Sequence, residues 1–418
     1  MNTSFREIRR AEHGIARDQI SRNALKVTDR LQQAGHLAYI VGGAPRDLLL
    51  GVVPKDFDIG TDASPEQVRA LFRNARLIGR RFRLAHVRFG REIIEVATFR
   101  GFGDGDDGDR DVGDSGRVLR DNVFGSEAED ALRRDFTVNA LMYDPATETL
   151  RDYAGGFDDV AARRLRLIGD AQARYREDPV RMLRAVRFQT KLDLTAEGET
   201  GALIPEMASL LADIPPARLL DELLKLLLSG HAATGFAGLV ATGLWQQLFP
   251  GLLADPHDPP LLLKRALANT DQRVAEDKPV TPGFLFAALF WPRVSARSRA
   301  LVDAGQPPID ALAQAGEEAF SDPAWRVAVH RRFSTMAKEI WMFQPRFERR
   351  RGKRALKLLG ERRFRAAYDF LLLRALEDPS LTELAEWWTE IQQLDAQGRE
   401  QMVAGGARHR SPRTRPAP

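Results

Sequence analysis

The pattern of apolar and polar residues differs between the first part of the chain and the rest. Short apolar runs separated by polar turns predict strands, and longer amphipathic segments between them predict helices. One helix is predicted over about residues 21–34, with Ser21 as N-cap and Gly35 past its end, and another over 65–74 after Ser64. The predicted strands are LAYIV (37–41), FDIGT (57–61), LAHVRFG (84–90) and REIIEVATF (91–99).

From about residue 170 onward, the apolar residues recur at helical spacing. No alternating segment of useful strand length interrupts them, so we expect the remainder of the chain to be all-α. With 418 residues, the chain exceeds a single hydrophobic core and is expected to form two or three domains. The predicted fold class is α+β, a small mixed-sheet head followed by an all-α neck and body. The predicted helices include residues 177–192, 217–230, 231–249 and 283–291.

The composition of the chain excludes several classes of protein but does not by itself indicate a function. The chain has 62 Lys and Arg against 58 Asp and Glu, and its net charge of +4 is unexceptional. It contains no Cys, which excludes disulfides, a thiolate nucleophile and Cys-ligated zinc and fits a reducing compartment. The N-terminus lacks the apolar core of a signal peptide, and no apolar run reaches the ~18 residues of a membrane helix. We expect a cytoplasmic protein with no membrane partner.

The most informative turn of the chain begins at Gly42. Gly42 and Gly43 open a Gly-Gly-x-x-Arg-Asp sequence whose backbone can approach a phosphate closely, at the start of a predicted helix. Arg46 adds a cation that can fork onto phosphate oxygens. Alone, a Gly-Gly pair is only a tight turn, so its interpretation depends on the residues downstream of it.

A pair of carboxylates, Asp56 and Asp58, lies downstream of this turn. They occupy positions i and i+2 of a strand predicted to start at about Lys55, so they are expected on one face, where they can hold one or two divalent ions. An isolated Asp-x-Asp is usually a solvated strand end. Beside a phosphate-binding turn, however, the pair suits nucleotidyl transfer, in which metals activate a hydroxyl and neutralise the leaving pyrophosphate.

Further polar residues are candidates for the same site. Arg133, Arg134, Asp135 and Asn139 form a cluster that suits either a surface ion pair or sugar and triphosphate binding. Glu95 lies in an apolar strand, where a carboxylate needs a partner. A metal shared with the Asp pair would serve as that partner, and so would an arginine.

The segment EDPVRMLRAVRF (177–188) combines acceptors and donors. Asp178 before Pro179 is a good N-cap, which is the structural explanation for this residue. Arg181, Arg184 and Arg187 follow at i+3 steps on one side of the helix, where like charges repel unless an anion meets them. Asp178 and Arg181 together offer the acceptor and donors that can read the edge of a base.

Two basic stretches lie near the C-terminus. Residues 346–365 contain ten Lys or Arg against two Glu, and residues 396–418 are rich in Arg, Pro and Gly. Such runs are commonly solvated helix faces. On a chain with candidate nucleotidyl-transfer chemistry, they favour contact with an RNA backbone. The predicted RNA-binding residues are Arg349, Arg350, Arg351, Lys353 and Arg354.

Two other segments resemble metal sites only superficially. Residues 103–114 repeat Asp and Gly and predict a disordered or mobile loop. A calcium loop starting at Asp104 would place Gly108 at its third ligand position and has no closing Glu. His257 and Asp258 are typical of phosphohydrolases, but they stand between prolines, which favours a connecting loop.

Taken in order, four segments resemble the class II polynucleotide nucleotidyltransferases, the polymerase-β-like branch that contains bacterial poly(A) polymerases and CCA-adding enzymes. The resemblance covers about residues 15–395, and LIGRRFRLAHV (77–87) resembles the signature of the poly(A)-adding members. Pro45 departs from the β-branched residue usual at its position, and its missing N–H would matter if that group touched phosphate. The four segments are GGAPRDLLLG (42–51), KDFDIGT (55–61), RRDFTVNAL (133–141) and EDPVRMLRAVRF (177–188).

This resemblance implies roles for individual residues. The implied catalytic residues are Asp56 and Asp58, which hold Mg²⁺ or Mn²⁺, with Asp135 and, in some members, Glu95 as a third carboxylate. The implied nucleotide-binding residues are Gly42, Gly43, Arg46, Arg134, Asn139, Asp178, Arg181, Arg184 and Arg187. The implied parts are a flexible arm (1–20), a catalytic head (21–169), a helical neck that recognises the base (170–250), a helical RNA-binding body (251–395) and a basic disordered tail (396–418).

The implied activity is template-independent transfer of AMP from ATP to RNA 3′ ends, with release of pyrophosphate, by a monomer. The expected partners are RNA 3′ ends and ATP, and the sequence does not identify RNA-degradation or RNA-chaperone partners. One alternative is a CCA- or A-adding tRNA nucleotidyltransferase, which shares the head and neck. A second is a catalytically inactive RNA-binding protein, against which the intact Asp56, Asp58 and Arg46 argue.

Overall fold

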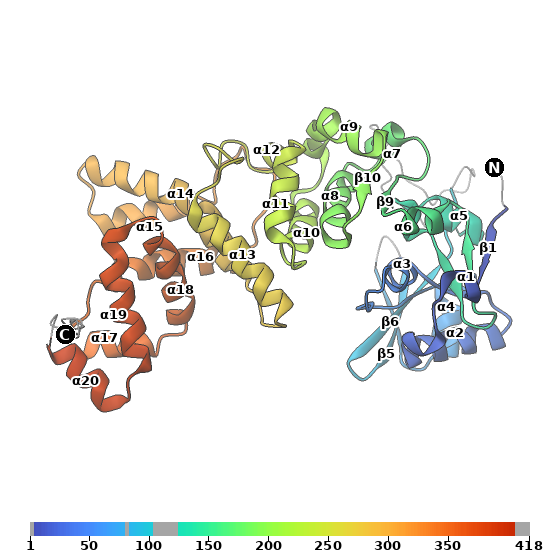
Figure 1. Cartoon of the computed structure of the whole chain (residues 1–418), viewed down its shortest axis with the longest axis horizontal. Helices are drawn as coiled ribbons and strands as arrows, with labels where there is room; N and C mark the ends of the chain where they lie inside the picture. Colours follow the sequence, from blue (N-terminus) through green and yellow to red (C-terminus); the bar gives the residue numbers. More distant parts are fainter. Residues whose placement is uncertain (1–3, 80–82, 103–123, 406–418) are drawn as a thin grey trace, which may run out of the picture. The chain divides into compact units, whose positions relative to one another are not determined.

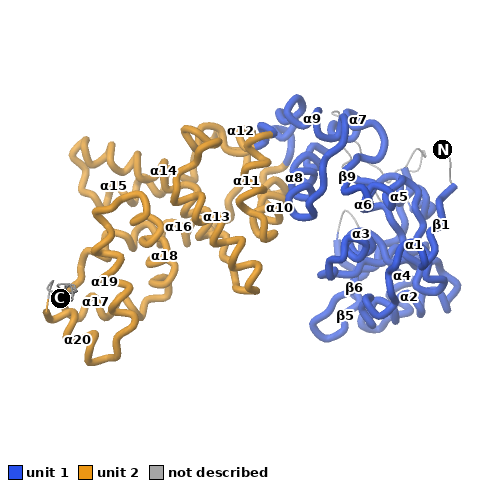
Figure 2. Tube along the Cα trace, in the orientation of Figure 1, with its two compact units in different colours: residues 1–214, 242–244 blue, residues 215–241, 245–418 orange. Residues whose placement is uncertain are grey.

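The structure, a computed structural model, describes residues 4–79, 83–102 and 124–405 (Figure 1). The predicted mobile loop at 103–114 and residues 406–418 of the predicted tail lie outside them. The chain divides into two compact units, Met1–Ile214 with Thr242–Leu244, and Pro215–Ala241 with Trp245–Pro418 (Figure 2). The residues predicted as a neck, 170–250, are shared between these units, and the five-part division stays a prediction.

Within the described residues, the first unit contains a mixed eight-stranded sheet in the order β1-β8-β7-β2-β3-β6-β5-β4. Strands β3 and β6 are parallel neighbours, and the other neighbouring pairs are antiparallel. The strands are β1 (Arg6–Arg9), β2 (Ala38–Val41), β3 (Asp58–Thr61), β4 (Ala75–Ile78), β5 (Leu84–Phe89), β6 (Glu92–Thr98), β7 (Met142–Asp144) and β8 (Thr149–Asp152).

Within the described part of the first unit, four helices, α2, α4, α5 and α7, begin at a side chain that caps them. Ser21 Oγ accepts hydrogen bonds from the backbone of Asn23 and Ala24, at 3.1 and 3.4 Å, as the predicted N-cap of α2. Ser64 caps α4 in the same way. The helices are α1 (Arg10–His13), α2 (Arg22–Gln33), α3 (Gly43–Leu49), α4 (Pro65–Leu71), α5 (Glu127–Leu132), α6 (Gly156–Ala161), α7 (Ala171–Glu177), α8 (Val180–Leu192) and α9 (Glu199–Met207).

Two expectations for this unit were wrong. Residues 6–9, assigned to a flexible arm, form β1, which pairs with β8 and buries Ile8 completely. A four-residue strand with one apolar residue is too short for a recognisable pattern, and its partner residues lie 140 to 146 positions away along the chain. The chain beyond residue 170 is also not entirely helical, since β10 (Thr195–Ala196) pairs with β9 (Arg164–Leu165).

The second unit is helical throughout its described residues. No helix in the part of the chain that the structure describes is long and apolar enough to cross a membrane. The helices are α10 (Pro216–Leu227), α11 (Ala232–Ala241), α12 (Leu244–Leu248), α13 (Leu261–Ala275), α14 (Pro282–Asp303), α15 (Pro308–Glu318), α16 (Arg331–Phe343), α17 (Gly352–Leu359), α18 (Phe364–Ala375), α19 (Thr382–Gln393) and α20 (Ala396–Gly405).

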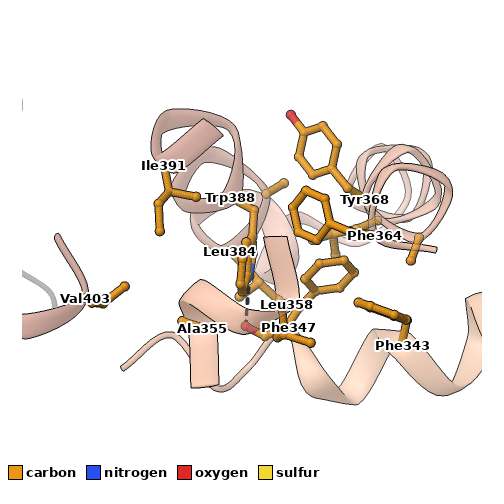
Figure 3. Close-up of a cluster of buried hydrophobic side chains, with 13 residues drawn as sticks. Phe343, Phe347, Ala355, Leu358, Phe364, Tyr368, Leu384, Trp388, Ile391 and Val403 are labelled. Atoms are coloured by element: carbon orange, nitrogen blue, oxygen red, sulfur yellow. Dashed lines mark hydrogen bonds between the residues drawn. The ribbon is translucent and has the colours of Figure 1, made fainter. Parts of the chain in front are cut away.

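An aromatic cluster forms the core around the last helices of this unit. Phe347, Phe364 and Trp388 pack together, and Trp388 Nε1 donates a hydrogen bond to the carbonyl of Phe347 at 2.9 Å (Figure 3). Val403 of α20 is buried in the same cluster. The prediction that the tail is disordered from residue 396 is therefore wrong up to residue 405, because α20 has its own apolar contact with the core.

Candidate active site

The carboxylates of the candidate site meet on neighbouring parallel strands. Asp58 is the first residue of β3 and stands opposite Glu95 of β6, so their side chains lie on the same side of the sheet. Asp56 lies before β3, in contrast to the prediction that the strand starts at about Lys55. Burial raises the pKa of Asp58 to about 6, and Glu95 and Asp56 add to the rise while Arg134 opposes it.

Glu95 has a protein partner of its own. Its carboxylate lies 3.1 Å from Nε2 of His86, which stands opposite it on β5. The sequence alternatives for this partner were a metal or an arginine, and the structure places a histidine there. Among the described residues, no three His, Asp or Glu side chains form a group arranged to hold a metal ion. The Asp56–Asp58 pair as metal site and Glu95 as a third carboxylate both stay predictions.

Gly42 lies directly beside Asp58. Its φ of +75° is strained for any other residue type. A Cβ at this position would stand 3.5 Å from Asp58 Oδ2 and 3.6 Å from Arg134 Nη1. Gly42 thus provides the turn that starts α3 and keeps the space beside the carboxylate and the guanidinium open.

Arg46 is held inside the protein by its neighbours, and its contact with a phosphate stays a prediction. It is 5% exposed, and its Nε and Nη2 donate to Asp47 Oδ1 at 2.9 and 2.6 Å. Its Nη1 donates to Asn139 Oδ1, and the guanidinium lies over the ring of Phe188. Arg46 therefore connects α3 to two distant segments, and the sequence could not show this because those partners are far along the chain.

Pro45 lies within the first turn of α3. The N–H groups of the first turn have no intrahelical acceptor, so the missing N–H of this proline costs no helical hydrogen bond.

The side chain of Asp135 is 11% exposed, and both of its oxygens accept hydrogen bonds from neighbouring groups. Its Oδ1 accepts hydrogen bonds from the Phe136 backbone and from Asn139 Nδ2, at 2.8 and 2.9 Å, and its Oδ2 accepts one from Arg184 Nε at 2.7 Å. Burial alone would raise the pKa of Asp135, but Arg184 and these hydrogen bonds lower it to about 2. The chain Arg46–Asn139–Asp135–Arg184 therefore joins α3 to α8 through internal contacts.

A second network surrounds the base-recognition candidates. Arg181, 8% exposed, donates from Nη1 to Glu177 Oε2 at 2.9 Å and to the carbonyl of Arg174 at 2.7 Å. Asp178 Oδ1 accepts from the Val180 backbone at 3.3 Å. Asp178 thus supports the first turn of α8 although the N-cap position itself is Pro179, one residue later than predicted.

The remaining predicted nucleotide-binding residues also have protein contacts. Arg134 donates to Asp130 Oδ2 at 2.8 Å and to the Asn139 carbonyl at 3.3 Å. The Arg187 guanidinium lies 4.5 Å from the ring centroid of Phe188. Gly43 is close-packed, since a Cβ there would stand 3.2 Å from Arg46 Nη2. Most of these arginines are held in place by the fold itself.

The basic segment of the second unit divides into two groups. Four of its arginines are ion-paired: Arg346 with Glu361, Arg350 with Glu383, Arg363 with Glu339 and Arg365 with Asp369. Six other cations are exposed and have no ion pair within the described residues: Arg349, Arg351, Lys353, Arg354, Lys357 and Arg362. Ala355 and Leu358 of α17 are buried in the aromatic cluster, whereas Lys353, Arg354 and Lys357 of the same helix are exposed.

Comparison with known proteins matches this architecture. Residues 38–166 match the family model described as "Poly A polymerase head domain", residues 193–255 "Probable RNA and SrmB- binding site of polymerase A" and residues 304–418 "Polymerase A arginine-rich C-terminus". The chain is 50% identical to Poly(A) polymerase I of Escherichia coli O6:H1 over 92% of its length and 85% of that protein. It is 45% identical to Poly(A) polymerase I of Haemophilus influenzae over 95% of its length and 90% of that protein.

The fold and these matches define a nucleotidyltransferase with a mixed-sheet head and a helical body. The chain belongs to the bacterial poly(A) polymerase family. A more distant relative is the CCA-adding enzyme of Bacillus velezensis, 37% identical over 55% of this chain and 56% of that enzyme.

Solved structures share the fold. A structure described as "tRNA-processing enzyme (apo form I)" has a TM-score of 0.62 and 20% identity, covering 92% of this chain and 99% of that one. The Thermotoga maritima CCA-adding enzyme complexed with tRNA has a TM-score of 0.53 and 19% identity, covering 79% of this chain and 72% of that one. These likenesses confirm the predicted α+β class.

Proposed function

We propose that this chain transfers AMP from ATP to RNA 3′ ends without a template and releases pyrophosphate. The observation that carries the proposal is the convergence of Gly42, Asp58 and Arg134. A carboxylate and a guanidinium both lie within van der Waals range of the position that a Cβ of Gly42 would take, at a turn that only glycine tolerates. This combination suits a triphosphate, whose charge a cation and backbone N–H groups can meet.

Asp56 and Asp58 would hold the divalent metal, Mg²⁺ or Mn²⁺. The donor set fits, because Mg²⁺ is usually bound by one or two carboxylates and completes its shell with water and phosphate oxygens. The raised pKa of Asp58 also fits, since neighbouring carboxylates disfavour its charge and a cation would offset them. When bound, the metal lowers the pKa of the attacking hydroxyl and neutralises charge on pyrophosphate.

Arg181 and Asp178 are the proposed reading pair for the adenine base. Two contacts of Arg181 Nη1 fix the orientation of its guanidinium plane, while Nε and Nη2 have no acceptor in the part of the chain that the structure describes. A planar donor fork held in this way suits the edge of a base. A further group of residues is proposed to act indirectly, without touching the nucleotide, by holding α3 and α8 in their relative positions. Its members are Arg46, Asn139, Asp135 and Arg184.

Exposed cations of the second unit are the proposed contacts to the RNA backbone. Arg349, Arg351, Lys353, Arg354 and Lys357 have charges that no described acid offsets, so phosphates can meet them at little cost. Arg350, predicted with this group, pairs with Glu383 at 2.8 Å, and we assign it a weaker contribution.

A nucleotide-specificity assay tests the proposal. The full-length protein is given ATP, CTP, GTP or UTP singly, on an unstructured RNA and on a tRNA that lacks its last three nucleotides. We expect adenylate tails on both RNAs. Addition confined to cytidine and adenosine on the tRNA would identify a tRNA nucleotidyltransferase instead, and no addition of any nucleotide would identify an RNA-binding protein.

A further inference from the structure

Arg174, on α7, lies between two parts of the candidate site without belonging to either. Its Nη2 donates to the carbonyl of Arg133 at 2.6 Å and also to the carbonyl of Arg134. Its Nη1 donates to Glu177 Oε2 at 2.6 Å. The Arg174 side chain is 14% exposed. One guanidinium thus fastens the backbone of the Arg-Arg-Asp turn to an acid at the end of α7.

The same acid holds the proposed base-reading arginine. Glu177 Oε2 accepts from both Arg174 Nη1 and Arg181 Nη1, and Arg181 Nη1 also donates to the backbone carbonyl of Arg174. At the other end, the Arg134 side chain borders the space beside Gly42 and Asp58. All of these residues belong to the first unit.

We infer that Arg174 is a positioning residue for nucleotide selection. It fixes the position of the Arg181 side chain relative to the turn that carries Arg134. The inference rests on the proposed function, because it assigns Arg181 to the base and Asp58 to the reacting phosphate. Arg174 touches neither, and it acts through Glu177 and through two backbone carbonyls.

Arginine is required for this role by its geometry. A guanidinium presents several donors in a rigid plane, so it can bind a carboxylate on one side and two carbonyls on the other. A lysine has the same charge but donates from one nitrogen, and it cannot span both sets of acceptors. Arg174→Lys therefore keeps the charge and removes the connection.

The test compares Arg174→Lys with Arg176→Lys, a matched change on the same helix at an exposed arginine. Single-nucleotide addition to an RNA primer is measured with ATP and with CTP, and thermal unfolding is followed in parallel. We expect the ratio of kcat/KM for ATP to that for CTP to fall about tenfold in Arg174→Lys, the scale of one lost charge-assisted hydrogen bond. Arg176→Lys should keep the ratio of the unchanged protein.

A second variant guards against a folding defect. Glu177→Gln removes the acid that Arg174 and Arg181 share, and it should lower the same ratio of kcat/KM for ATP to that for CTP. Because both changes break one connection, the double variant should lower this ratio no further than the stronger single variant does. An unchanged ATP to CTP ratio in folded Arg174→Lys and Glu177→Gln, even with reduced stability, would reduce Arg174 to a structural role. Failure of the proposed function looks different, because the unchanged protein itself would then not add AMP.

Discussion

Arginines near the candidate active site and arginines of the basic segment 346–365 differ in how the protein holds them. Arg46 and Arg181 are buried, and each donates to named acceptors on other segments. Arg349 and Arg354 are exposed, with no ion pair in the described part of the chain. In the first group the position of the cation is fixed and its partners are specific. In the second group the charge is available to any anion, and its effect is screened by salt.

The difference teaches that a count of basic residues does not identify a binding surface. Both regions are rich in arginine, but Arg181 and Arg184 of α8 are paired with the acids Glu177 and Asp135. On α17, Lys353, Arg354 and Lys357 have no ion pair within the described residues. Changes around the active site should therefore alter rate, selectivity or stability. Changes on α17 should alter RNA affinity and its salt dependence.

The largest expected effect is at the carboxylate pair. Asp58→Asn should lower the rate of AMP addition by about 10³-fold, because an amide does not hold the divalent ion on which the transition state depends. Stability should not fall, since burial already disfavours the Asp58 charge. Single-turnover AMP addition and thermal unfolding measure the two effects. A rate close to that of the unchanged protein would remove Asp58 from the metal site.

The next largest effect is expected at the ion pair of Asp135 and Arg184, near the candidate active site. Asp135→Asn should lower the free energy of unfolding by about 3 kcal/mol, because it removes the carboxylate that Arg184 meets at 2.7 Å in a mostly buried ion pair. Chemical denaturation measures this loss. Asp369→Asn, which breaks the partly exposed pair with Arg365 in the second unit, is the matched control and should cost less than about 1 kcal/mol. Equal losses would contradict the distinction between the two regions.

Acid should act on the same carboxylate. The folded pKa of Asp135, about 2, lies below its ordinary value of 3.8, so its pairing stabilises the fold above about pH 4. This contribution, about 2 kcal/mol, should be lost as the pH falls from about 4 to about 2. The difference in unfolding free energy between the unchanged protein and Asp135→Asn, followed against pH, isolates it. A difference that does not shrink with acid would contradict the assignment.

The smallest effect is expected at the exposed cations of the basic segment 346–365. Replacing Arg349, Arg351, Lys353 and Arg354 by Gln should weaken RNA binding and flatten the dependence of log affinity on log salt by up to about 3, at about 0.7 per contact. The rate of chemistry at saturating RNA should be unchanged. A matched variant replaces four ion-paired arginines and should change the slope less. Its substitutions are Arg346, Arg350, Arg363 and Arg365 to Gln.

Local sequence signals predicted much of the fold and only part of the site. The capping of α2 by Ser21 and the existence of strands β2 and β3 follow from neighbouring residues, although β3 begins at Asp58, later than predicted. Strand β1 was missed because its stability comes from pairing with β8, which no local pattern records.

The same limit applies within the site. The sequence placed Gly42 near Asp58, since only sixteen positions separate them. It could not show that Arg46 would be held by Asn139, 93 residues away, or that Glu95 would meet His86. Arg174 was overlooked although it lies seven residues before Arg181, within reach of the same glutamate on consecutive helices. The available signal for this contact was the placement of Arg174 and Arg181 on either side of Glu177 in the sequence.

Strand β1 also has a consequence for how the protein is prepared. It forms one margin of the eight-stranded sheet and covers the outer hydrogen-bonding groups of β8. A truncated sample that begins after residue 10 would expose those groups as an open template, to which a second molecule could add a strand. Shortening this end would therefore change self-association more than it changes catalysis, and a purification tag is better placed where it leaves Arg6–Arg9 free to pair.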